Sequence, residues 1–175
     1  MATLLTSPTA QPFFDDKVRA FWTLQTFGWV GWFVLRGASG LANGQDLYFL
    51  VPLLVSGITG FSLTVTLSVA FRMLMQQRAL IMWPLAGLTV AVATVFYSFI
   101  DASMVAIQPR GTDAAFTTLF LGAFYLDAVT LAAWSSLYFA INYFLRVEQQ
   151  IDQLARLESQ ATASQLAMLR YQINP

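Results

Sequence analysis

Three stretches of this sequence are too long and too apolar for the elements of a water-soluble domain. Residues 47–71 give 25 consecutive uncharged positions, and residues 79–100 give 22. Residues 114–145 add 32 positions interrupted only by Asp127. A helix rises about 1.5 Å per residue, so each stretch is long enough to cross a hydrocarbon core of roughly 30 Å. A helix also satisfies its own backbone hydrogen bonds in lipid, so we expect each stretch to be a transmembrane helix.

A fourth, weaker span precedes these three. Residues 20–35 are 16 apolar-leaning positions, and we expect the span to extend to about residue 41, with the Arg36 charge reaching the interface. Links rich in Gly, Asn and Pro join the spans. The sequence therefore predicts an all-α fold: a four-transmembrane-helix bundle over residues 17–145, with spans at about 20–41, 47–71, 79–100 and 114–145.

Basic residues predict the orientation of the spans. Only Arg36 and Arg110 fall on one side of the predicted membrane. The other side has seven basic residues: Lys17, Arg19, Arg72, Arg78, Arg146, Arg156 and Arg170. Because basic residues collect in cytoplasmic loops, both termini are predicted to be cytoplasmic. Residues 1–16 lack a basic n-region and a small-residue cleavage site, which favours a mobile cytoplasmic tail over a signal peptide.

Composition excludes several classes of function. Nine basic residues balance nine acidic ones, so no nucleic-acid-binding surface is predicted. The 175 residues contain no cysteine and no histidine. This excludes thiolate and imidazole metal ligands as well as a Ser-His relay. We therefore predict no catalytic residue, no cofactor and no metal site within this chain.

Residues 146–175 differ from the rest of the chain, because they are polar and contain no Gly and no Pro before Pro175. Such a composition favours a helix that continues the last span into the cytoplasm. Its apolar residues form two triplets with helical spacing: Val147, Ile151 and Leu154, then Leu166, Leu169 and Ile173. The triplets are out of heptad phase, so the segment is either a dimeric coiled coil with a register slip or an amphipathic helix on another subunit or on the headgroups.

The last ten residues, LAMLRYQINP, carry a family resemblance. They resemble the start of the kinase core of LytS-like sensor histidine kinases, where a Leu-x-x-Leu-x-x-Gln-Ile/Leu-Asn-Pro helix leads directly to the phosphoacceptor histidine. Leu169, Gln172, Asn174 and Pro175 match this approach motif. Residues 21–29 and 134–139 are similar, more loosely, to the first and last spans of the multi-pass sensors attached to such kinases.

The resemblance implies the membrane sensor and signalling helix of a two-component kinase in a bacterial inner membrane. It further implies a homodimer formed through the signalling helix, and a response regulator that acts with a kinase core after Pro175. The 175 residues contain no phosphoacceptor histidine and no ATP-binding lobe. This segment alone is therefore not expected to phosphorylate itself.

One face of the first span carries candidate sensing residues at spacings of 3, 4, 3 and 4: Trp22, Gln25, Trp29, Trp32 and Arg36. Such a stripe could form an aromatic wall for a lipid-like or quinone-like signal, with Gln25 as its polar contact. The alternative is a helix-packing face with tryptophan anchors at the membrane interface.

Asp127 is the least expected residue in the spans, because a carboxylate near the bilayer centre costs about 2.5–3.5 kcal/mol. It must face the bundle, within reach of a hydroxyl of the third span such as Thr89, Thr94 or Ser98. It is either a protonation or ligand switch or a hydrogen bond that fixes helix packing.

Arg36 and Asp101 end two spans on the predicted outer side. They either pair at the rim of a ligand site or remain two solvated charges that contribute little.

Two other functions compete with a kinase sensor. A truncated relative could serve as a structural or accessory subunit of a larger membrane protein complex. A small transporter or channel could be centred on Asp127, but it would favour several polar residues at mid-membrane and an internal repeat, which the sequence does not show.

Overall fold

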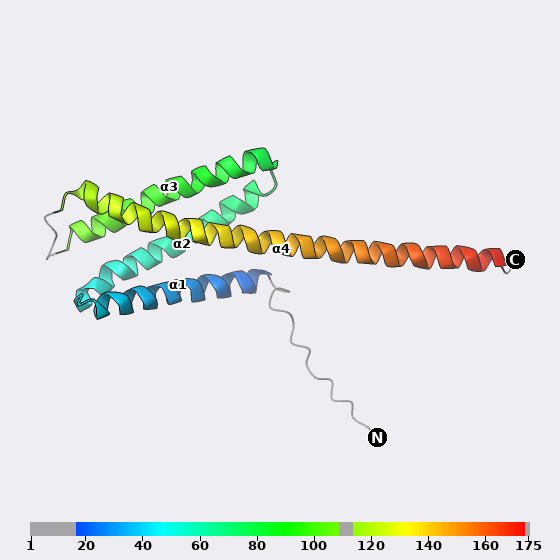
Figure 1. Cartoon of the computed structure of the whole chain (residues 1–175), viewed down its shortest axis with the longest axis horizontal. Helices are drawn as coiled ribbons and strands as arrows, with labels where there is room; N and C mark the ends of the chain where they lie inside the picture. The colour runs from blue at the N-terminus through cyan, green and yellow to red at the C-terminus, as the bar shows by residue number, and fades with distance from the viewer. Residues whose placement is uncertain (1–16, 109–113, 174–175) are drawn as a thin grey trace, which may run out of the picture.

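The computed structural model describes residues 17–108 and 114–173, and within these ranges the chain is helical with no strand (Figure 1). The elements are α1 (Lys17–Ala42), a short 3-10 turn η1 (Leu47–Phe49), α2 (Leu50–Leu74), α3 (Ala79–Ala106) and α4 (Phe116–Ile173). The all-α class predicted from the sequence is confirmed. The predicted tail at residues 1–16, the loop residue Arg110, and Asn174 with Pro175 lie outside the described residues.

Three stretches are long and apolar enough to cross a membrane: Leu47–Leu74, Ala79–Ala106 and Phe116–Leu169. Large apolar side chains on their outward faces are exposed, for example Val92 and Phe96 on α3. A water-soluble protein would bury such a surface, whereas a lipid bilayer covers it. The helices therefore indicate a membrane protein. α1 does not belong to this set, so its role as a span remains a prediction.

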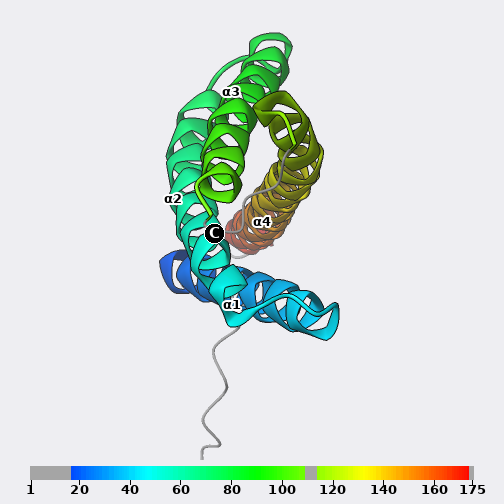
Figure 2. The ribbon, with the colours of Figure 1, turned by 90° about the vertical axis from the view of Figure 1, so that its left-hand side faces the viewer.

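The helices run alternately up and down, and each packs on the next one along the chain (Figure 1). α4 also contacts α2, which makes α2, α3 and α4 one packed group. α1 packs against α2, and in Figure 2 it lies below this group and runs across it. The C-terminal ends of α1 and α3 and the N-terminal ends of α2 and α4 lie at the same end of the molecule (Figure 1).

Phe71 of α2 is fully buried at the centre of the aromatic core. Its ring lies 4.6 Å from that of Phe139 and 5.7 Å from that of Tyr138, both on α4. The Tyr138 hydroxyl donates a hydrogen bond of 3.1 Å to the Ser68 carbonyl of α2. These contacts attach the middle of α4 to α2.

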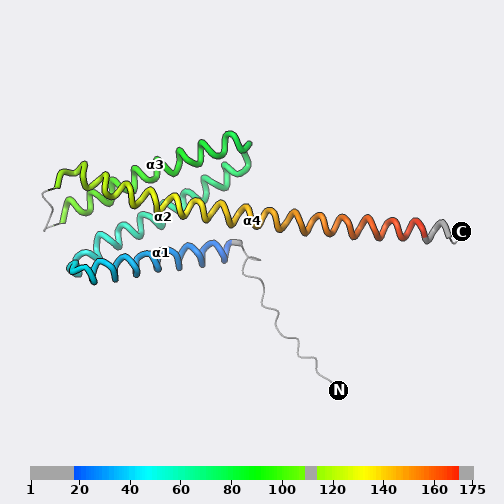
Figure 3. Tube along the Cα trace, in the orientation of Figure 1, coloured from blue at the N-terminus to red at the C-terminus, as the bar shows by residue number. Residues whose placement is uncertain are grey.

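α4 is one uninterrupted helix of 58 residues, which makes it about 87 Å long (Figure 3). It passes Arg146, where the apolar sequence gives way to the polar segment, without a break. The Arg146 guanidinium lies 3.5 Å from the Met75 carbonyl of the turn between α2 and α3. Beyond it, every residue from 147 to 169 is exposed, and no other helix of the described chain lies beside this part of α4.

Candidate functional site

The first of two buried polar groups centres on the Gln25 side-chain amide, which is 3% exposed. The Gln25 amide nitrogen donates to the Thr64 hydroxyl of α2 at 2.5 Å, and the amide oxygen accepts from the Trp134 indole of α4 at 2.9 Å. The Trp29 indole donates to the same Thr64 hydroxyl at 3.0 Å. We call Gln25, Trp29, Thr64 and Trp134 the amide cluster. It is a hydrogen-bonded connection between α1, α2 and α4.

The amide cluster explains part of the tryptophan stripe on α1. Gln25 and Trp29 are buried with their polar atoms bonded inside the protein. The Trp32 ring packs 5.5 Å from that of Trp29. Trp22 is 47% exposed and lies beside Phe61. The structure thus assigns the centre of the stripe to helix packing and leaves Trp22 at the surface.

Gly60 of α2 lies between the amide cluster and a second polar group. A Cβ atom at this position would overlap the Trp29 ring on one side and approach the Tyr97 hydroxyl to 2.7 Å on the other. Only glycine lets α1 and α3 approach α2 this closely at one level.

The second group lies between α2, α3 and α4, nearer the C-terminal end of α3. The Ser56 hydroxyl donates to one Asp101 oxygen, Oδ2, at 3.0 Å and is 3.1 Å from the Tyr97 hydroxyl. Tyr97 is fully buried and also donates to the Ser56 carbonyl at 3.1 Å. Together with Ser98 and Asp127 these residues form what we call the carboxylate cluster.

Asp127 is 5% exposed and lies beside the Ser98 hydroxyl of α3. Thr89 and Thr94, the other hydroxyls considered for it, bond to carbonyls of their own helix, and the Ser98 hydroxyl also donates to the Thr94 carbonyl at 2.8 Å. The carboxylate oxygen Oδ2 of Asp127 has no hydrogen-bond partner among the described residues, and the same is true of Asp101 Oδ1. Asp127 also interacts electrostatically with Asp101. An acid on α3 and an acid on α4 therefore lie close enough to interact electrostatically, with Asp127 buried and Asp101 half-buried.

Arg36 and Asp101, both among the described residues, do not form an ion pair. Arg36 is exposed on α1, and its positive charge acts on both Asp101 and Asp127. The hydrogen-bond partner of Asp101 is instead the Ser56 hydroxyl. The predicted rim residue Asp101 is thus joined to the interior of the protein.

Sequence reasoning missed Ser56, Thr64 and Tyr97 because hydroxyl residues are common in transmembrane helices and usually bond to their own backbone. One signal could have found two of them. Ser56, Gly60 and Thr64 recur every four residues on α2, and all three are buried. Small and polar residues at this spacing mark a helix face that other helices approach closely.

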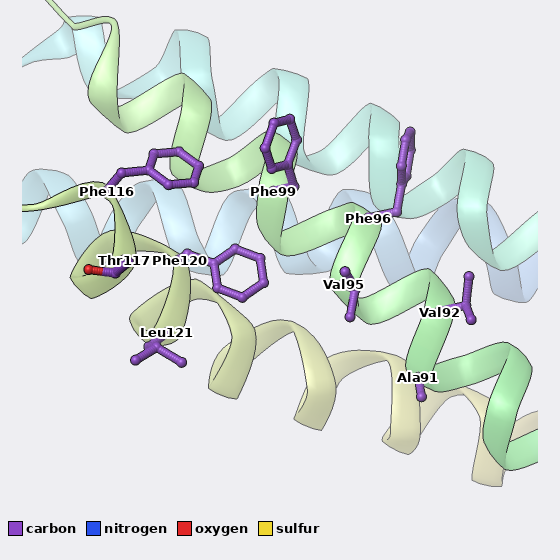
Figure 4. A pocket seen from close by; sticks show the side chains of 9 residues that line it. All are labelled: Ala91, Val92, Val95, Phe96, Phe99, Phe116, Thr117, Phe120 and Leu121. Atoms are coloured by element: carbon purple, nitrogen blue, oxygen red, sulfur yellow. The ribbon is translucent and has the colours of Figure 1, made fainter.

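A separate apolar groove of about 810 Å³ lies on the surface of the protein between α3 and α4 (Figure 4). Four phenylalanines, Phe96, Phe99, Phe116 and Phe120, line much of it, and Thr117 is its single polar residue. The Phe99 and Phe116 rings meet edge to face at 5.8 Å. In a bilayer this groove faces acyl chains.

The approach-motif residues lie at the far end of α4. Leu169 is 53% exposed there, and the Gln172 backbone is helical. Nothing in the described part of the chain gathers three or more acidic, histidine or cysteine side chains into a metal site. Comparisons of the chain with models of known protein families, with curated proteins and with solved structures give no match.

Proposed function

We propose that this chain is the transmembrane sensor and signal-transmitting part of a two-component histidine kinase. The proposal rests on one observation above the others, which is the continuity of α4. A single helix joins the membrane-embedded polar clusters to the segment that resembles the approach to a kinase core. A change in helix packing around the clusters is thereby passed to the cytoplasmic end of α4 without a flexible link.

The signal acts on two alternative packings of α4 against α2 and α3. Trp134, Leu131 and Asp127 lie on one face of α4 at spacings of 3 and 4, and they bring the amide cluster and the carboxylate cluster onto the same helix. Biasing two packings of a helix bundle requires only a few kcal/mol of differential binding. The cytoplasmic part of α4 pairs with that of a second copy, and the kinase core acts on a response regulator.

The proposed setting is a bacterial inner membrane, with α1 as a fourth span and both ends of the chain in the cytoplasm. Lys17, Arg72 and Arg146 lie on elements or turns at the end of the bundle from which α4 protrudes, which supports this orientation.

The decisive experiment has two steps. The coding sequence beyond Pro175 is read first, and a histidine followed by Phe-Leu-Phe-Asn is expected. The natural full-length product, purified in lipid nanodiscs, is then incubated with labelled ATP, and transfer to that histidine is expected to depend on an unbroken α4. A stop codon after Pro175, with co-purification of a larger membrane complex, would overturn the kinase proposal in favour of an accessory subunit.

A further inference from the structure

We propose that Asp101 and Asp127 form an intramembrane binding site for one monovalent cation, either a proton or Na⁺. The carboxylate cluster supplies oxygen atoms from three helices: the Ser56 hydroxyl on α2, the Tyr97 and Ser98 hydroxyls and Asp101 on α3, and Asp127 on α4. Oxygen is the ligand atom that hard cations prefer.

Two buried oxygens in this cluster have no partner among the described residues, namely Asp101 Oδ1 and Asp127 Oδ2. Asp127 is 5% exposed, so water does not replace the missing partner at the protein surface. A buried acceptor without a donor is costly, and an unpaired carboxylate is more costly still. A cation bound beside these acids would supply the positive partner that the two oxygens lack.

The charges around Asp127 favour a single monovalent cation. The charged groups that act on Asp127 are Asp101 of α3 and Arg36 of α1, and α2 contributes only the neutral Ser56. Two carboxylates and one guanidinium leave a net charge of −1. Like charges in one apolar site disfavour each other's ionisation, so one added positive charge is the stable state. A divalent ion would leave the site positive, and no third acidic ligand is found for it in the described chain.

The cluster is also placed where a cation can reach it. Asp101 is partly exposed and lies five residues before the C-terminal end of α3. Asp127 is deeper, beside Ser98, which is one helical turn from Asp101 on the same face of α3. A cation enters past Asp101 and stops at Asp127.

The test measures cation binding by this chain itself, so its outcome does not depend on any kinase readout. The 175-residue protein is purified in detergent, and its melting temperature is followed as choline is replaced by Na⁺ at constant ionic strength. The same titration is repeated from about pH 8 to pH 5. A ligand that binds only the folded state raises the melting temperature with its concentration.

A rise with Na⁺ at fixed pH identifies Na⁺, and an equal rise on acidification in Na⁺ and in choline identifies the proton. In either case Asp127→Asn is expected to melt at the temperature of the cation-bound wild type. Its apparent affinity for the cation is expected to be at least tenfold lower. Asp152→Asn, on the exposed part of α4, is the matched control and should titrate like the wild type.

Infrared difference spectra of the same samples give a second measurement, which does not depend on thermal unfolding. Protonation adds a carboxylic-acid C=O band that Asp127→Asn removes, whereas Na⁺ shifts the carboxylate bands only. The proposed site is wrong if neither the melting temperature nor the spectrum changes with either cation. It is also wrong if Asp127→Asn responds as the wild type does.

Discussion

At the scale of single residues, the Gln25 amide has the largest structural role for its size. It accepts from Trp134 and donates to Thr64, so it joins three helices through one side chain. Gln25→Leu keeps the apolar bulk but removes these two bonds, together with a longer one of 3.3 Å from the Gln25 amide nitrogen to the Phe61 carbonyl. Interhelical hydrogen bonds in membranes contribute about 0.6–1.7 kcal/mol each, so we expect a loss of about 1–3 kcal/mol. Unfolding in a denaturing detergent measures it, and Thr26→Leu, on the exposed side of α1, should change stability little.

Gly60 gives a second prediction at this scale. Gly60→Ala adds one methyl group that overlaps the Trp29 ring and crowds the Tyr97 hydroxyl. Overpacking of this kind costs about 1–3 kcal/mol. Gly57→Ala is a matched control one turn away on α2, since its Cβ would lie 3.7 Å from Trp32, an ordinary contact. Equal unfolding midpoints for the two variants would contradict the close approach at Gly60.

At the scale of secondary structure, α4 depends on the absence of glycine and proline between Gly122 and Pro175. Gln153→Pro removes a backbone hydrogen bond in the exposed part of the helix and is expected to kink it. Spin labels on cysteines at 143 and 165 should be about 33 Å apart in the straight helix. Pulsed spin-resonance distances should be narrow in the parent and in Gln153→Ala, but shorter or broader in Gln153→Pro.

The sequence was informative about elements and less so about contacts. Runs of uncharged residues locate α2, α3 and α4, because lipid leaves a polar backbone few alternatives. Asp127 could be singled out, since a lone acid in an apolar span stands out by chemistry. The residue beside Asp127 could not be predicted, because Thr89, Thr94 and Ser98 are chemically alike. Which of them faces Asp127 depends on the rotation of α3 about its axis. The joining of Gln25 to Trp134 likewise depends on contacts 109 positions apart.

At the scale of the whole molecule, the proposed orientation gives a direct test. The chain has no cysteine, so single cysteines can be introduced without background. Asn43→Cys lies between α1 and α2, whereas Gln77→Cys lies between α2 and α3, and Ser159→Cys lies on the exposed part of α4. In intact cells a membrane-impermeant maleimide should label position 43 alone. Labelling of position 77 or 159 in intact cells would show that the orientation is the opposite of the proposed one.

The length of α4 on either side of Tyr138 has a mechanical consequence. Tyr138 is bonded to α2, and eleven residues separate it from Asp127, a distance of about 17 Å along the helix. The other arm, from Tyr138 to Ile173, is 35 residues or about 53 Å long. If α4 pivots as a rigid rod about Tyr138, a sideways displacement of about 1 Å beside Asp127 becomes a displacement of about 3 Å at Ile173. In the proposed signalling role, α4 would therefore amplify a displacement as well as transmit it.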